Sequence, residues 1–252
     1  MARYFLELAY NGTDFHGWQM QDNAPSIQQE ITEKLSTILQ TITTITGCGR
    51  TDAGVHASQF YAHFDADKLP IESDLLVHKL NTMLPASIAI YGMYQVQNDA
   101  HTRFNATKRS YQYFISTRKD PFNADCSYKF NVPLNLDMMN KACELLLGEQ
   151  DFGCFCKANA DNHTDICTVF HANWEQNEQM IVFNITANRF LRNMVRAIVG
   201  TLLDVGQGRT SLEDFELILA SKDRTEAGRS VPAHGLFLSR VEYPTNLFIT
   251  TE

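Results

Sequence analysis

Hydrophobic and polar positions alternate along the chain with two different periods, which predict a mixture of strands and helices. Residues 4–10 alternate bulky and polar side chains, as a half-buried strand does. Ser26 stands three residues before Gln29, in the spacing of a capping box, and is followed by apolar residues at intervals of four, four and three. This pattern predicts a helix near 26–40.

The same two periods predict the remaining elements. We expect strands near 41–46, 59–65, 87–96, 109–117, 168–175, 180–187 and 235–243, and helices near 72–84, 136–147, 189–205 and 211–220. Such a mixture indicates an α/β or α+β fold with two similar-sized halves, of which we favour α+β. The polar stretch 97–108 resembles a junction, so we expect an N-terminal subdomain over 1–104 and a C-terminal one over 105–252.

Composition places the chain among ordinary globular proteins. Of its 252 residues 44% are apolar and 20% charged, which excludes disordered and collagen-like classes. No apolar run approaches the roughly 18–20 residues of a membrane span, and the first residues lack the apolar core of a signal peptide. The six cysteines are too few for a disulfide scaffold. We therefore expect reduced thiols and a cytoplasmic location.

The net charge of −8 argues against indiscriminate binding to nucleic acids, but the charge is unevenly distributed. Residues 101–129 carry six basic and two acidic side chains, a local charge of +4. Phosphate contacts depend on where cations lie, so this basic strip can serve a polyanion. A solvated face that happens to be basic is the equal alternative.

The segment 49–56, Gly-Arg-Thr-Asp-Ala-Gly-Val-His, is the most informative in the chain. Its glycines allow a sharp turn between two strands, which can present Asp52 at the floor of a cleft. The guanidinium of Arg50, two residues away, would oppose the rise in the carboxyl pKa that burial causes and keep Asp52 ionised as a nucleophile. The alternative is a turn in which Asp52 only caps its own backbone.

Six motifs, in order from near residue 10 to near 240, resemble the TruA family of tRNA pseudouridine synthases. They are Phe15-His16-Gly17-Trp18-Gln19, the string Arg50 to Ala57, Arg103-Phe104-Asn105-Ala106 with Arg109 to Tyr113, Gly148 to Phe152 with Phe155, Phe190 to Arg196, and Pro232 to Leu238. The resemblance implies the pseudouridine synthase fold, with antiparallel-rich sheets that flank a central RNA-binding cleft. It also implies a symmetric homodimer that binds tRNA.

The implied activity is conversion of uridine to pseudouridine at positions 38, 39 and 40 of the tRNA anticodon stem-loop, with no cofactor and no metal. Asp52 matches the family's essential aspartate, and Tyr111 matches the tyrosine that contacts the target base. The chemistry needs an anionic side chain beside the sugar and a flat aromatic to hold the detached uracil. Alternation of Tyr111 and Tyr113 with Ser110 and Gln112 also fits strand residues that face the core.

Arginines at helical spacing are the next candidates. On a helix from Asn188, three arginines would share one face. The match of Arg196 to the family's Phe-Leu-x-x-x-Val-Arg motif implies an ion pair with Asp52, and we expect Arg189 and Arg192 to contact phosphates. A solvated basic stripe is the alternative. Further candidates for the RNA backbone are Arg103, Lys108 and Arg109, and for the substrate pocket Arg50 and Leu236; for Leu236 and Leu238, ordinary core packing is the alternative.

A metal site is a weaker reading of the second half. Cys154, Cys156, His163 and Cys167 lie within fourteen residues, but the Cys-x-Cys spacing differs from that of zinc sites, so inert thiols are favoured. Two other functions remain to be tested. One is a non-catalytic RNA-binding module, and the other is a zinc hydrolase or deaminase, which lacks the expected His-x-Glu and Cys-x-x-Cys pattern.

Overall fold

The computed structural model describes residues 1–157, 163–177 and 180–249 and divides the chain into two compact units. Unit 1 comprises Met1–Thr107 together with the chain from Leu238 onwards, and unit 2 comprises Lys108–Phe237. The junction predicted from the sequence falls after residue 104 and gives everything that follows to the second half. In the structure the division follows Thr107, and the C-terminal segment returns to unit 1.

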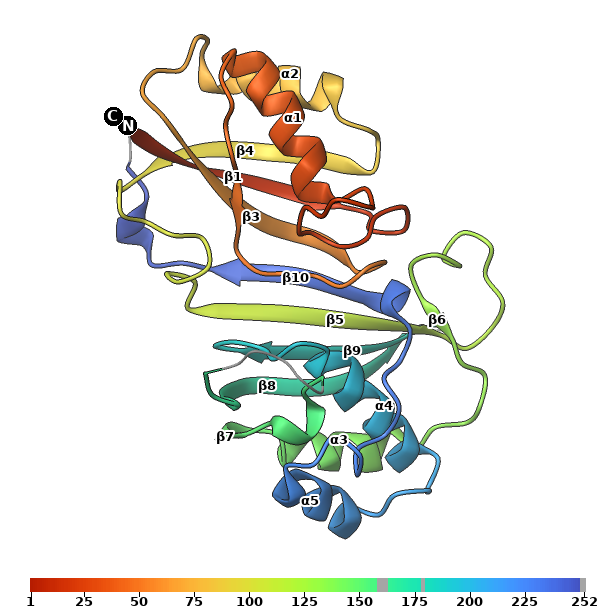
Figure 1. The fold of residues 1–252 in the computed structure, drawn as a ribbon. Coiled ribbons are helices and arrows are strands. Elements are labelled where there is room, and N and C mark those ends of the chain that lie inside the picture. Colours follow the sequence, from red (N-terminus) through yellow and green to blue (C-terminus); the bar gives the residue numbers. More distant parts are fainter. Residues whose placement is uncertain (158–162, 178–179, 250–252) are drawn as a thin grey trace. The chain divides into compact units, whose positions relative to one another are not determined.

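Unit 1 is built on a sheet with the strand order β4-β1-β3-β10, in which β1 pairs antiparallel with both β4 and β3 (Figure 1). Its strands are β1 (Ala2–Tyr10), β2 (Thr46–Gly47), which pairs with β3, β3 (His56–Ala66), β4 (Ile88–Val96) and β10 (Leu236–Glu242), of which residues 238–242 belong to this unit. Successive side chains of β1 point to opposite faces of the sheet, and Leu6 and Leu8, which share one face, are completely buried. The expected strand over 41–46 is largely wrong, because only Thr46 of that stretch joins the sheet.

Two helices complete unit 1, α1 (Ile27–Leu39) and α2 (Ser73–Met83), which contact each other, while α2 also contacts β4. The Ser26 side chain accepts a hydrogen bond from the Gln29 backbone N–H, a cap that is worth about 1 kcal/mol. The Gln29 side chain donates to Glu33 instead of returning to Ser26, so only half of the expected capping box forms. The helix itself is confirmed.

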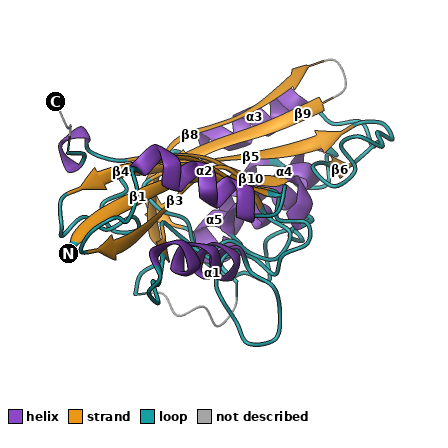
Figure 2. Ribbon diagram, turned by 90° about the horizontal axis from the view of Figure 1, so that it is seen from above, coloured by secondary structure: helices purple, strands orange, loops and turns teal. Residues whose placement is uncertain are grey.

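Unit 2 has the antiparallel strand order β5-β9-β8-β7, with β6 parallel to β5. Its strands are β5 (Lys108–Ser116), β6 (Tyr128–Lys129), β7 (Gly148–Asp151), β8 (Ile166–Asn177) and β9 (Met180–Ala187); its helices are α3 (Leu136–Glu144), α4 (Met194–Gly206) and α5 (Leu212–Ser221). Helix α3 lies beside β8 and contacts α4 (Figure 2). Both units mix helices with antiparallel strands, which confirms the α+β class.

Helix α4 is the apolar centre of unit 2. Most of its side chains are buried, including Met194, Ile198 and Leu202. Its start at Met194 corrects the expected helix over 189–205. Asn193 precedes it in the left-handed conformation, with φ 67°, and ends the irregular segment that follows β9. No helix in the described part of the chain could cross a membrane.

Candidate active site

Asp52 lies in the loop that joins β2 to β3 in unit 1, as the glycine-punctuated segment predicted. The Val55 backbone N–H donates to the Asp52 carbonyl at 3.1 Å and closes a four-residue turn. Gly54, the third residue of this turn, has φ +76°, a left-handed conformation that glycine adopts without strain. Asp52 is half-buried and Arg50 is exposed. The local sequence therefore fixes the backbone that carries the carboxylate.

A second loop supports this turn from residues 12–18. The Trp18 N–H donates to the Thr51 carbonyl at 3.4 Å, and the Gly54 N–H donates to the Phe15 carbonyl at 3.3 Å. The two hydrogen bonds bracket Asp52 on both sides. The motif Phe15 to Gln19, for which the sequence alone predicted no role, thus holds the backbone of the Asp52 turn.

Two glycines make the close approach of the two loops possible. A Cβ at Gly12 would collide with the Val55 carbonyl, and a Cβ at Gly17 would collide with the Thr51 carbonyl. Gly17 also has φ +88°, which other residues rarely adopt. Both positions therefore need glycine for space.

Aromatic and imidazole side chains lie under the two loops. The rings of Trp18 and Phe60 stack with centroids 4.1 Å apart, and both are buried. Buried His56 accepts a hydrogen bond from the Gly12 N–H at Nδ1, at 3.0 Å, so that nitrogen carries no proton. The hydroxyls of Tyr10 and Thr51 lie 2.9 Å apart. Sequence reasoning assigned no role to His56, although it is part of the string that identified the loop.

In unit 2, Tyr111 lies on β5 opposite Ile185 of β9. Its half-buried ring meets the edge of Phe190 at a centroid distance of 5.0 Å and an interplanar angle of 86°. The reading of both tyrosines as core residues holds for Tyr113 alone, which is fully buried and donates its hydroxyl to the Pro232 carbonyl at 2.9 Å. Burial raises the pKa of Tyr113. Tyr111, in contrast, is only partly buried.

Arg196 lies in the first turn of α4 and is half-buried. Its Nε donates to the Val231 carbonyl at 2.8 Å, and the Val231 N–H returns a hydrogen bond to the Arg196 carbonyl at 3.2 Å. The neighbouring chain lies so close to α4 that a Cβ at Gly200 would collide with the Arg229 carbonyl. These contacts fix the orientation of the Arg196 guanidinium within unit 2.

The expected arginine face of one helix is wrong. Arg189 and Arg192 precede α4 in irregular backbone, so they do not share a helical face with Arg196. Arg192 is exposed and Arg189 is half-buried. Both remain candidates for phosphate contacts, but from a loop.

The other predicted residues are distributed over both units. In unit 1, Arg103 is exposed. In unit 2, Arg109 donates from Nη1 to the Asn188 carbonyl at 3.1 Å. The Nζ atom of Lys108 lies 5.2 Å from the centroid of the Phe170 ring. Leu236 and Leu238 are both buried, which agrees with the core-packing alternative.

The cysteine cluster consists of buried cysteines at positions 154, 156 and 167, whereas His163 is exposed. Burial raises the pKa of Cys154 to about 12 and that of Cys167 to about 11, so both thiols are protonated at neutral pH. Among the residues that the structure describes, no group of three or more His, Cys, Asp or Glu could hold a metal ion.

Comparisons with known proteins point in one direction. A family model described as tRNA pseudouridine synthase matches residues 142–244. The chain is 49% identical over 249 residues to tRNA pseudouridine synthase A of Bacteroides fragilis, covering 98% of this chain and 99% of that protein. It is 48% identical to the protein of the same name from Parabacteroides distasonis, with 98% of each chain covered.

A more distant relative and one solved structure also match this chain. A tRNA pseudouridine synthase A of Francisella tularensis subsp. novicida is 38% identical over 97% of this chain and 95% of its own. Among solved structures, a Cbf5-Nop10-Gar1 complex matches with a TM-score of 0.31 and 11% identity, over 79% of this chain and 54% of that one. At this similarity the structural match says nothing about the fold of this chain.

Proposed function

Because the chain belongs to the tRNA pseudouridine synthase A family, we propose that it isomerises uridine to pseudouridine at positions 38, 39 and 40 of the tRNA anticodon stem-loop. The observation that carries the proposal is the geometry of the Asp52 turn. A half-buried carboxylate sits on a backbone that two loops and two obligatory glycines hold in place. A catalytic group gains from such a rigid support because small misplacements slow reactions strongly.

In this proposal Asp52 is the catalytic carboxylate. The reaction breaks the bond from C1′ to N1 of uridine and joins C1′ to C5. No atom is added overall, because the C5 proton leaves and N1 gains one, so the balance requires no cofactor. The carboxylate acts at the sugar or base by covalent addition or by guiding loss of a ribose proton. Asp52 is an acceptor in its ionised form and suits either route.

Tyr111 holds the uracil ring during its rotation. Its partly accessible ring, braced edge-on by Phe190, can stack on the base, which is worth roughly 1–3 kcal/mol. Arg196 orients Asp52 as an ion-pair partner, Arg50 contacts the substrate, and Leu236 lends apolar surface to the pocket.

The RNA backbone is bound by five basic residues, which are Arg103, Lys108, Arg109, Arg189 and Arg192. The stem-loop is recognised mainly by shape and phosphates, since the deep groove of an RNA helix shows little sequence. The enzyme acts as a homodimer in the cytoplasm. Sedimentation of the purified protein with and without tRNA measures the dimer directly.

The decisive experiment treats the purified protein with a chelator, adds unmodified tRNA and scores uridine isomerisation by position. We expect full activity after chelation and loss of at least about 10⁴-fold in Asp52→Asn, since removal of a catalytic nucleophile costs this much. The control Asp67→Asn changes an exposed carboxylate that pairs with the N-terminal amine, and it should stay active.

Three other outcomes would contradict this proposal or a part of it. Activity that disappears with the chelator would favour a zinc enzyme. Tight tRNA binding without isomerisation by the wild-type protein would favour the non-catalytic RNA-binding module. An active Asp52→Asn variant would remove Asp52 from the mechanism.

A further inference from the structure

The segment 100–105 in unit 1 presents a phenylalanine to solvent. Phe104 is 74% exposed although the His101 ring lies 4.3 Å from it, centroid to centroid. The Arg103 guanidinium lies 5.6 Å from the same ring. A single exposed apolar residue is common in proteins, so exposure alone indicates nothing. The way the segment is held separates Phe104 from an ordinary surface residue.

Local hydrogen bonds close the segment into a defined turn. The His101 N–H donates to the Asn105 side-chain oxygen at 2.6 Å, and the Asn105 N–H donates to the His101 carbonyl at 3.0 Å. The Arg103 N–H donates to Nδ1 of the His101 ring at 3.1 Å. The turn thus carries Phe104 at its tip with the neighbouring imidazole fixed.

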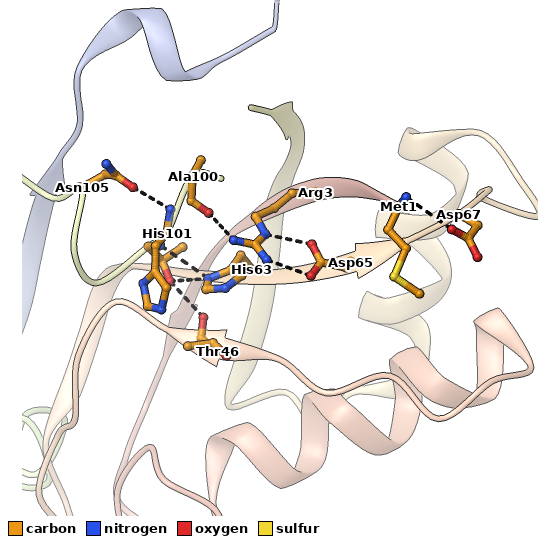
Figure 3. Close-up of polar contacts among 10 residues, drawn as sticks. Met1, Arg3, Thr46, His63, Asp65, Asp67, Ala100, His101 and Asn105 are labelled. Atoms are coloured by element: carbon orange, nitrogen blue, oxygen red, sulfur yellow. Dashed lines mark hydrogen bonds and ion pairs between the residues drawn. The ribbon is translucent and has the colours of Figure 1, made fainter. Parts of the chain in front are cut away.

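Side chains from the sheet anchor this turn at its base (Figure 3). Arg3, held by two hydrogen bonds of 2.8 Å to Asp65, donates from Nη1 to the Ala100 carbonyl at 2.8 Å. The buried Thr102 hydroxyl donates to the Thr46 carbonyl at 2.9 Å and lies 2.8 Å from Nδ1 of buried His63.

A network of this extent under an exposed aromatic side chain pre-organises it for contact with a ligand. A rigid aromatic group loses little conformational entropy on binding.

The charge around Phe104 suits an anionic ligand. Arg103 is the nearest charged residue in sequence, and residues 100–107 contain no acidic side chain. Phe122 differs from it, because it is 94% exposed on a turn made by Asp120, and its sequence neighbours Arg118, Lys119, Asp120 and Asp125 balance in charge. Two exposed phenylalanines therefore differ in charge and in anchoring, and only the first combines an aromatic ring with a guanidinium.

We propose that Phe104 and Arg103 form a stacking platform for an unpaired base of the RNA substrate, with the guanidinium on an adjacent phosphate. Stacking on aromatic rings and guanidinium planes is the usual way in which proteins bind unpaired bases. The platform rests on the proposed function and adds a base contact to it. It compensates part of the stacking that the RNA loses when the target nucleotide leaves its helix.

A fluorescence titration tests the contact directly. Both native tryptophans, Trp18 and Trp174, are buried, so an indole introduced by Phe104→Trp supplies the solvent-exposed emission. Addition of an unmodified anticodon stem-loop RNA should quench this emission and shift it. The matched variant Phe122→Trp should show no saturable change. An unchanged Phe104→Trp spectrum at saturating RNA, with binding verified by anisotropy, would overturn the platform.

Affinity measurements then separate stacking from charge. Phe104→Ala should weaken RNA binding by roughly 5- to 100-fold with an unchanged salt slope, since one stacked base is lost and no phosphate contact. Phe104→Tyr should restore the affinity, and Phe122→Ala should bind as the wild type does. Equal affinities of Phe104→Ala and Phe122→Ala would contradict the proposal.

Three further results would each have a different consequence. Loss of binding accompanied by a change in sedimentation mass would make Phe104 a contact between protein copies and overturn the platform. A wild-type protein that never isomerises tRNA uridine would refute the proposed function itself. If the wild-type protein isomerises uridine and Phe104→Ala loses nothing, only the platform fails.

Discussion

The fit of Gly17 against the Asp52 turn can be tested with one methyl group. In Gly17→Ala, the added Cβ meets the Thr51 carbonyl about 1 Å inside ordinary contact, and the backbone must also keep φ +88°. Gly148→Ala is the matched control, because Gly148 has φ +92° and nothing within 4 Å of the added Cβ. The two variants share the conformational strain and differ in the collision.

The expected magnitudes follow from these two contributions. Left-handed strain costs about 1–2 kcal/mol, of which the stiffer unfolded chain returns about 0.4–1 kcal/mol, so Gly148→Ala should lose about 1 kcal/mol of unfolding free energy. Gly17→Ala should lose about 1–3 kcal/mol more, because the collision forces the two loops apart. A displacement of about 1 Å at Asp52 should also lower the single-turnover rate by about 100-fold.

Urea unfolding followed by tryptophan fluorescence measures the stability, and single-turnover isomerisation at saturating enzyme measures the rate. Trp18 reports on unit 1, which contains Gly17, and Trp174 reports on unit 2, which contains Gly148. Equal losses of stability in both variants, together with a wild-type rate for Gly17→Ala, would show that the Gly17 contact does not position the catalytic turn.

Variants at three further positions probe the remaining groups. Tyr111→Phe should keep the RNA affinity, since Phe190 braces the ring and not the hydroxyl, whereas Tyr111→Ala should weaken it about fivefold or more; equal binding by both would exclude stacking. Arg196→Lys should lower kcat with little effect on KM, because lysine cannot reproduce the Nε hydrogen bond to Val231; an unchanged kcat would contradict a positioning role. Burial lowers the pKa of His63 from 6.5 to about 4. The unfolded chain therefore binds a proton more readily than the folded protein does. The stability that this residue contributes above pH 6.5 is lost as the pH falls toward 4. Urea titrations should show a loss of about 2 kcal/mol between pH 7 and pH 5 from this residue, which His63→Gln abolishes; parallel curves for both proteins would contradict the assignment.

Local sequence was sufficient where short-range rules decide the structure. The helix after Ser26 forms because a cap and an apolar stripe coincide, and the loop around Asp52 forms because Gly54 adopts a conformation that other residues avoid. Both signals lie within a few residues of the features that they determine. The amino-acid pattern alone was therefore enough to place Asp52 on a tight turn between strands.

Long-range contacts explain what the sequence left out. The arginine spacing before residue 194 fits a helix, but the Asn188 side-chain oxygen accepts from the Thr168 N–H, and the Asn188 backbone N–H donates to the Thr168 carbonyl. These bonds fix Asn188 beside β8. The supporting role of Gly12 and His56 likewise depends on a contact across 44 residues of chain, which no local pattern reveals.

The placement of β10 has a consequence for synthesis on the ribosome. This strand lies next to β3, and its Val241 N–H donates to the side chain of Gln59, yet it is made after all of unit 2. A nascent chain that has released its first 107 residues leaves part of one side of β3 unpaired, which invites pairing with other chains. Unit 1 is thus completed only after unit 2 has been translated, and β3 depends on residues 238–242 to cover this side.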